Sequence, residues 1–205
     1  MAWSRKRSTP ASATASRGRG ALLVANGTVH AARHVTKTHT TDLGAFESPD
    51  YGPEGVVGPD GTVRYLRPVQ PRRTIAAGRI EPEVLLLAVA AGSDDRPLRW
   101  ALEAGYKGLV IEGSGAGNVP AAVVPGIAAA LAAGVPVVLA SRCRRGFLAL
   151  VYGGGGAAGG GADLMALGVV PADHLPGPKA RIKLMVALGT GADLAGVRSL
   201  FAGTG

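Results

Sequence analysis

Residues 84–90 (VLLLAVA), 108–112 (GLVIE) and 135–141 (VPVVLAS) are three short apolar runs, and they decide how the second half of this chain folds. Each run is short enough for a strand that is buried on both faces. Helical sequences separate the runs, so strands and helices alternate along this half. That alternation predicts βαβ units that share one parallel sheet, and the fold class is therefore α/β.

The helices between and after these runs have recognisable ends. Residues 93–104 begin with Ser-Asp-Asp, which can cap a helix, and residues 120–133 predict a second helix that stops at a glycine. Residues 178–188 and 193–201 predict a terminal pair of helices. With the three apolar runs, these helices predict a Rossmann-like parallel-sheet domain over residues 80–205.

Two hairpin signals organise the first half of the chain. Asn26-Gly27 follows a short apolar run and favours a two-residue turn in which both residues have positive φ. Gly55–Val57 and Val63–Tyr65 flank a second turn signal at Asp60-Gly61. Residues 68–79 contain prolines, glycine and arginines and predict a linker between the two halves.

Charge and composition argue against several classes of function. Five positive charges and no negative ones lie in residues 1–19, which we expect to be a disordered, basic, solvated tail. No aromatic residues are interleaved with these charges, so we expect no specific nucleic-acid partner. No uninterrupted apolar run is long enough to cross a bilayer, so we expect no membrane partner. The single Cys143 excludes a disulfide within the chain and favours a cytoplasmic setting.

Residues 35–40 (VTKTHT) place Lys37 among hydroxyl side chains just after the first hairpin. A lysine in such a turn is ordinarily solvated. It can act as a proton acceptor only where its surroundings lower its pKa enough to leave some neutral amine. The residues alone leave both interpretations of Lys37 open.

Residues 113–118 (GSGAGN) form a glycine-rich turn after the second apolar run. A dinucleotide-binding loop would need glycine at position 118, which is Asn118, and no acidic ribose partner is evident. Asn118 can instead be a turn residue. The four histidines have no acid or cysteine at metal-ligand spacing, so we expect structural or solvent-facing roles for them and no metal site.

Taken in order, these segments resemble the bacterial L-asparaginase family, type I/II. The resemblance runs from about Gly18 to Phe201, nearly the whole chain. The segments that carry it are 18–33, 35–40, 46–55, 104–118, 137–142 and 177–181.

The resemblance implies hydrolysis of L-asparagine to aspartate and ammonia, with no cofactor and no metal. Family members use a nucleophilic threonine on an N-terminal glycine-rich loop, supported by a relay of a second threonine, an aspartate and a lysine. A hydroxyl needs such a base before it can attack an amide. By this resemblance Lys37 is the catalytic relay lysine. Asn118 is a substrate-binding residue that reaches the site of a neighbouring protomer, so a homo-oligomer is implied.

This chain departs from the family pattern at its front. It contains neither a Gly-Gly-Thr nor a Gly-Thr-Asp tripeptide, and His34 stands where the family usually has an acid. We therefore expect residues 20–67 to be a remnant of the N-terminal catalytic domain, and the chain to be truncated and inactive alone. Two alternatives remain open: a non-catalytic ligand- or partner-binding α/β module, and a relative of the ammonia-releasing component of tRNA-dependent amidotransferases.

Overall fold

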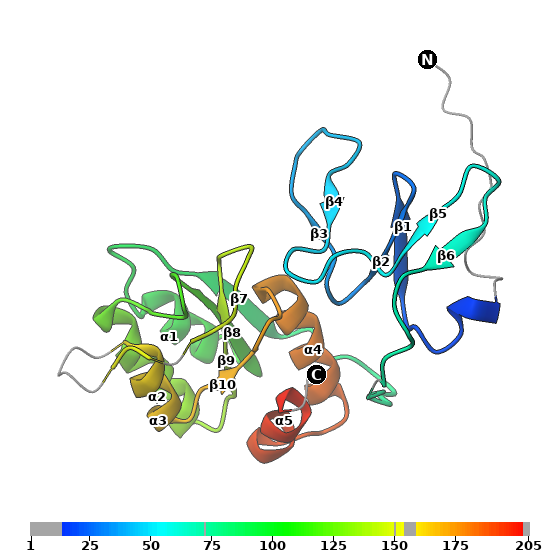
Figure 1. The fold of residues 1–205 in the computed structure, drawn as a ribbon. Coiled ribbons are helices and arrows are strands. Elements are labelled where there is room, and N and C mark those ends of the chain that lie inside the picture. Colours follow the sequence, from blue (N-terminus) through cyan, green and yellow to red (C-terminus); the bar gives the residue numbers. More distant parts are fainter. Residues whose placement is uncertain (1–13, 72, 150, 154–158, 203–205) are drawn as a thin grey trace. The chain divides into compact units, whose positions relative to one another are not determined.

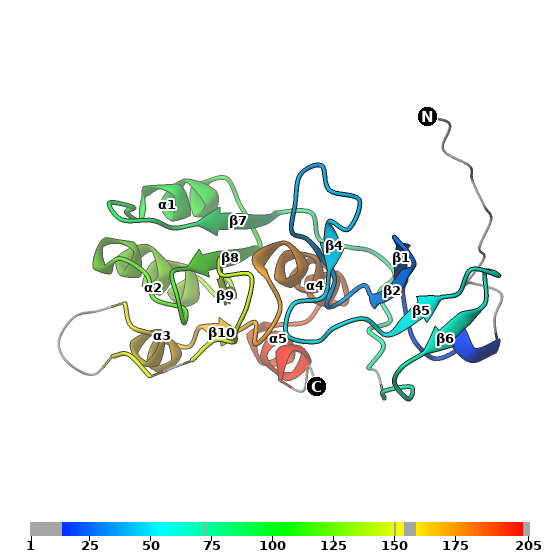
Figure 2. The ribbon, with the colours of Figure 1, turned by 45° about the horizontal axis from the view of Figure 1, so that its top comes forward.

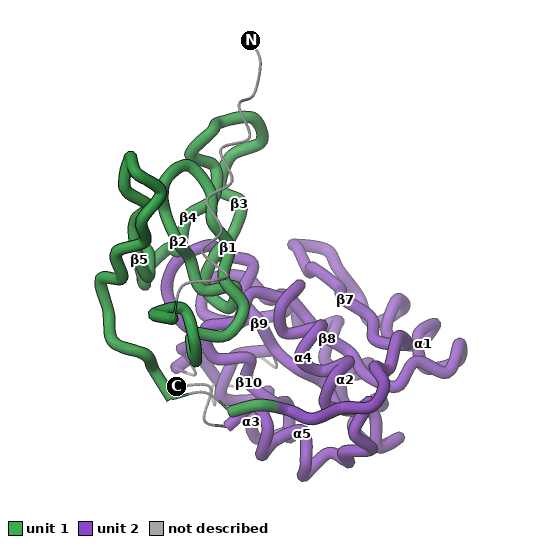
Figure 3. The backbone as a smooth tube through the Cα atoms, turned by 90° about the vertical axis from the view of Figure 1, so that its right-hand side faces the viewer, with its two compact units in different colours: residues 1–74 green, residues 75–205 purple. Residues whose placement is uncertain are grey.

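The chain divides into two compact units, residues 1–74 and residues 75–205 (Figure 3). The computed structural model describes residues 14–71, 73–149, 151–153 and 159–202. The division falls within the stretch 68–79, where we expected a linker. The identities that we assigned to the two halves stay predictions, and each unit is described by itself.

Unit 2 is built on a four-stranded parallel sheet with the strand order β10-β9-β8-β7 (Figure 1). The three apolar runs supply β7, β8 and β9, which confirms the α/β class that they predict. The short fourth strand, β10, was not anticipated from the sequence. The strands are β7 (Val84–Ala88), β8 (Gly108–Gly113), β9 (Val137–Ser141) and β10 (Val170–Pro171).

Helices cover both faces of this sheet, with α1, α2 and α3 on one side and α4 and α5 on the other (Figure 2). Alternation along β8 sends Leu109 and Ile111 into the first core and Val110 into the second. The result is a three-layer unit with two apolar cores. The helices are α1 (Arg96–Glu103), α2 (Val124–Ala132), α3 (Gly161–Leu167), α4 (Gly177–Gly189) and α5 (Leu194–Phe201).

Several helix ends differ in detail from the expected ones. The carboxylate of Asp95 makes no capping hydrogen bond to α1 and pairs with the guanidinium of Arg99. The second helix begins as a 3₁₀ turn, η3 (Ala121–Val123), before α2. Asp193 does cap α5, because its carboxylate accepts the N–H of Gly196 at 2.8 Å. Helix α3 was missed, since it follows a run of glycines with no helix-start signal.

Unit 1 contains an antiparallel sheet with the strand order β1-β2-β5-β6. The Asn26-Gly27 turn has φ values of 45° and 72°, as its sequence predicts. A separate two-stranded pair, β3 with β4, was not anticipated. The strands are β1 (Leu22–Ala25), β2 (Thr28–Ala31), β3 (Thr36–Lys37), β4 (Phe46–Glu47), β5 (Gly55–Val57) and β6 (Val63–Tyr65).

Arg19 corrects our expectation of a solvated tail over residues 1–19. Residues 1–13 lie outside the described part of the chain, but Thr14–Ser16 form a 3₁₀ turn, η2, and Arg19 is buried. The Arg19 guanidinium donates to two backbone carbonyls at 2.9 Å and lies 3.6 Å from the Glu54 carboxylate. It also stacks over the Tyr65 ring, 3.8 Å from the centroid. A glutamate far along the sequence therefore holds this part of the expected tail.

The Arg19→Ala variant should destabilise unit 1 selectively. It leaves the Glu54 carboxylate buried without its cation, a change that costs about 3 kcal/mol of unfolding free energy. Hydrogen exchange of the β5 and β6 amides, compared with the β8 amides of unit 2, measures the effect. Arg17→Ala is the matched control, because Arg17 is exposed. Equal exchange in the two variants would contradict a structural role for the buried pair.

Candidate functional site

Lys37 lies on β3, where it is paired in register with Phe46 of β4. Its side chain is exposed, and the neighbouring Thr36 is opposite Glu47. Because successive side chains of a strand point to opposite faces, Lys37 and Phe46 share one face of the hairpin. The strand pairing therefore fixes the face on which the lysine amine is presented.

The loop between β3 and β4, residues 38–45, is held by local hydrogen bonds. The Thr38 N–H donates to the Ala45 carbonyl at 2.7 Å, and the Thr38 hydroxyl lies 3.0 Å from a Glu47 carboxylate oxygen. The His39 Nδ1 accepts the N–H groups of Thr41 and Asp42 at 3.2 and 3.0 Å. The hydroxyl-rich sequence thus folds a defined loop beside Lys37.

A buried polar chain of Thr28, His30 and Ser48 connects β2 with the residue that follows β4. The His30 Nε2 lies 2.8 Å from the Thr28 hydroxyl, and its Nδ1 lies 2.9 Å from the Ser48 hydroxyl. Burial lowers the pKa of His30 below 6.5, and the nearby Glu47 carboxylate partly opposes that shift. Sequence reasoning assigned the histidines structural or solvent-facing roles. It had no signal for this contact, whose two ends are 18 residues apart.

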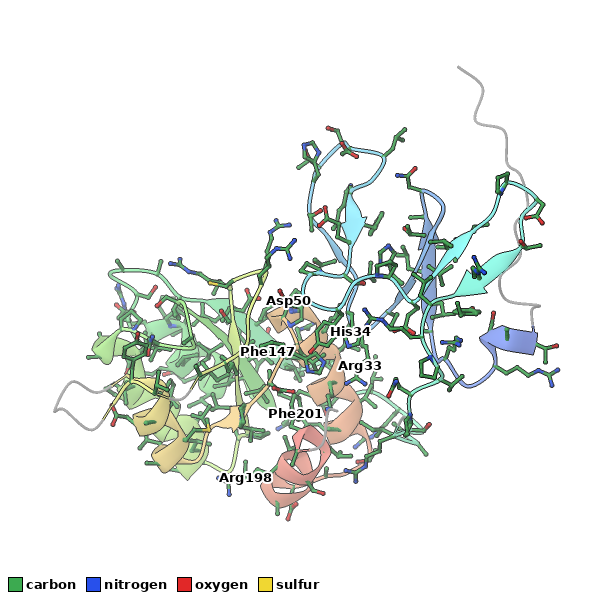
Figure 4. All side chains as sticks on the ribbon, in the orientation of Figure 1. Arg33, His34, Asp50, Phe147, Arg198 and Phe201 are labelled. Carbon is green, nitrogen blue, oxygen red and sulfur yellow. The ribbon has the colours of Figure 1, made fainter. Side chains whose placement is uncertain are left out.

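His34 stands where the resembling family usually carries an acid, and it stacks flat on Tyr51 (Figure 4). The two ring centroids are 3.7 Å apart with an interplanar angle of 1°. The His34 N–H also donates to the Ala31 carbonyl at 2.9 Å. The aromatic contact joins the end of the first hairpin to the loop that follows β4.

In unit 2 the candidate residue Asn118 closes a turn at the carboxyl end of β8. The Ser114 N–H donates to the Asn118 carbonyl at 2.8 Å, and the Asn118 N–H donates to the Ser114 carbonyl at 2.9 Å. Within the described residues, the Asn118 side-chain amide makes no hydrogen bond. The backbone of Asn118 therefore holds the turn, and its side-chain amide remains available to a ligand.

Other polar groups gather at the carboxyl edge of the parallel sheet. The Ser141 hydroxyl donates to the Gly115 carbonyl at 2.6 Å and ties β9 to the Asn118 turn. A Glu112 carboxylate oxygen accepts the N–H of Gly177, the first residue of α4, at 3.0 Å. Lys179 follows on the same helix, and burial lowers its pKa to about 8. Ligands of open α/β sheets bind at this edge.

The two predicted site residues lie in different units, Lys37 in unit 1 and Asn118 in unit 2. Their predicted roles in catalysis and substrate binding stay predictions. No group of three or more His, Cys, Asp or Glu side chains in the described residues could hold a metal ion. In the same part of the chain, no helix is long and apolar enough to cross a membrane.

Two family models match the chain in succession. The model described as Asparaginase, N-terminal matches residues 8–70, and the model described as Glutaminase/Asparaginase C-terminal domain matches residues 83–201. The second match alone covers more than half of the chain. The resemblance inferred from motifs is therefore confirmed by comparison with whole-domain models.

Three curated relatives illustrate the similarity. The chain is 40% identical to a probable L-asparaginase of Deinococcus radiodurans over 90% of this chain and 56% of the relative. It is 33% identical to L-asparaginase 2 of Escherichia coli over 91% and 53%. It is 32% identical to one subunit of the glutamyl-tRNA(Gln) amidotransferase of Pyrococcus horikoshii over 83% and 39%. The chain thus spans about half the length of these relatives, or less.

The stability of unit 1 should depend on pH through His30. The pKa of His30 is below 6.5 in the folded state, so the unfolded chain binds a proton first as pH falls. The stabilisation is fully present above about pH 6.5 and is lost as pH falls through the lowered folded pKa. Hydrogen exchange of the β1 and β2 amides at about pH 7.5 and about pH 5.5, corrected for intrinsic rates, measures it.

The His30→Gln variant should lose this pH dependence, whereas His39→Gln should keep it. His39 lies on an exposed loop and serves as the matched control. The same pH dependence in His30→Gln as in the unmodified chain would show that another group is responsible.

Proposed function

Because this chain belongs to the glutaminase/asparaginase family, we propose that it forms part of an L-asparaginase that hydrolyses asparagine to aspartate and ammonia. The similarity to the Deinococcus relative supports this choice, since it extends over 90% of the chain and includes both halves. A cytoplasmic setting and a homo-oligomer belong to the same proposal.

Lys37 carries the proposal at the level of the structure. The β3–β4 pairing presents an exposed amine beside a loop that is tied by its own threonine and histidine. In the proposed reaction, the neutral amine accepts a proton that is passed from an attacking hydroxyl, and the resulting cation returns it to the leaving ammonia. Lysine suits this role because its pKa responds strongly to its surroundings.

The attacking hydroxyl must come from outside the Lys37 hairpin. The chain has neither of the two tripeptides, Gly-Gly-Thr and Gly-Thr-Asp, by which we recognise the nucleophile loop and the relay segment. We propose that a segment with these motifs completes the site, and that the chain alone is inactive. Asn118, whose side-chain amide makes no hydrogen bond within the described residues, would then bind substrate.

The first test is to fuse this chain to the N-terminal part of the Deinococcus relative that it does not match. We expect ammonia release from asparagine by the fusion and none by the chain alone. Lys37→Ala should lower kcat of the fusion about 10³-fold, because a positioned proton acceptor contributes about that much. Lys107→Ala is the control, since Lys107 is also an exposed lysine next to a strand.

Full activity of the Lys37→Ala fusion would contradict the relay role. Failure of the fusion to release ammonia, together with a thermal shift of the unmodified chain by asparagine, would favour the non-catalytic binding module. Hydrolysis of glutamine that depends on added tRNA would favour the amidotransferase relationship, which the 32% identical relative suggests.

Asn118→Ala in the fusion should raise KM for asparagine about tenfold and leave kcat within about twofold, because a lost substrate hydrogen bond weakens binding by such a factor. Ser114→Ala is the control. It removes the hydroxyl that lies 3.3 Å from the Asn118 carbonyl and keeps the amide. Equal KM values in the two variants would assign Asn118 to the turn alone.

A further inference from the structure

The buried polar and charged residues of the described chain all belong to unit 1, and two of them, His30 and Ser48, touch each other. Their exposed fractions are 4% and 5%. Buried polar groups are kept where each one finds a partner. The proposed reaction uses neither residue directly, so the contact needs its own explanation.

The hydrogen bonds around His30 define which ring nitrogen carries the proton. The Thr28 hydroxyl donates to the Ala25 carbonyl at 2.8 Å, so toward His30 it can only accept. The His30 Nε2 therefore carries the hydrogen, and Nδ1 accepts the Ser48 hydroxyl proton. The chain Ser48 to His30 to Thr28 to Ala25 is complete with a neutral imidazole, and every polar atom in it has a partner.

Few charged groups face His30. Across the sheet its partner on β1 is Leu23, and on β5 the register opposite Val29 falls on Gly55. The titratable neighbour is Glu47 of β4, the residue before Ser48. Arg19 and Glu54, the other buried charges of this unit, pair with each other. Glu47 is therefore the charge that competes with burial in setting the protonation of His30.

Ser48 occupies the corner where β4 ends. Its backbone carbonyl accepts the N–H groups of Tyr51 and Gly52 at 3.2 and 2.7 Å, which turns the chain away from the hairpin. Its side chain is bound to His30, on β2. Residues 30–48 thus form a closed loop fastened at its base, and the β3–β4 pair with Lys37 lies inside it.

We propose that His30 is a positioning residue for Lys37: by bridging Thr28 and Ser48 it fastens the base of the β3–β4 hairpin to β2 and fixes where the lysine amine is presented. The catalytic part of this inference rests on the role proposed for Lys37. The ordering of the hairpin does not, because it follows from the contacts of His30 alone. Ser48 is too deeply buried to meet a substrate, so the pair is not a nucleophile and its base.

The test compares hydrogen exchange of residues 36–48 in the full chain and in its Ser48→Ala variant. At about pH 7.5, protection of these amides should fall about tenfold in Ser48→Ala, since one end of the closed loop is released. Ser48→Thr keeps the hydroxyl and should restore protection to within about twofold. Amides of β1 should change little in both variants.

Thr62→Val is the matched control. It removes a side-chain hydrogen bond to Asp60, 2.7 Å long, at the β5–β6 turn of the same unit. It should leave the exchange of residues 36–48 unchanged. Unchanged protection in Ser48→Ala would overturn the proposal. An equal loss over β1 and β2 would also overturn it, because the contact would then serve the whole sheet.

Kinetics of the fusion enzyme separate this inference from the proposed function. Ser48→Ala should lower kcat about tenfold and leave KM within about twofold, because a misplaced relay lysine slows chemistry without removing a substrate contact. Ser48→Thr should recover kcat. A fusion without activity would refute the proposed function, and the exchange data would still decide whether His30 orders the hairpin. An active fusion with unchanged kcat in Ser48→Ala would refute the positioning role.

Discussion

Burial of strand β8 on both of its faces is the constraint on which unit 2 depends. Leu109 and Ile111 pack into one core and Val110 into the other, and all three are 0% exposed. The strand begins and ends with glycine for steric reasons. A Cβ at Gly108 would lie 2.9 Å from the Leu184 side chain, and one at Gly113 would lie 2.8 Å from the Asn118 carbonyl. The same strand that joins the two cores therefore also delivers the Asn118 turn to the edge where ligands bind.

Unit 1 is organised by directional polar contacts. Arg19 reaches Glu54 and two carbonyls, and His30 connects β2 to the residue after β4 through hydroxyl groups. Such contacts specify one arrangement more narrowly than apolar packing does, because a buried polar group without its partner is costly. This suits a segment whose proposed task is to hold one lysine in place.

The sequence predicts the elements whose signals are local. The apolar runs of β7 to β9 and the turn at Asn26-Gly27 were anticipated because periodicity and turn chemistry act over a few residues. The β3–β4 pair and β10 were missed because two residues per strand carry no periodicity. Motifs singled out Lys37 and Asn118, but not the surroundings of Lys37. Those depend on the contact of His30 with Ser48, which only the folded chain brings together.

The contrast between the two interiors has a calorimetric consequence. Exposure of apolar surface raises the heat capacity on unfolding, whereas exposure of polar surface lowers it. Unit 2 buries two apolar clusters, and the buried polar and charged residues of the described chain belong to unit 1. Per residue, unit 1 therefore unfolds with the smaller heat-capacity change, and its stability curve is the flatter of the two. Cooling weakens the packing of unit 2 more than the polar contacts of unit 1, so the two units differ in the temperature at which each is most stable.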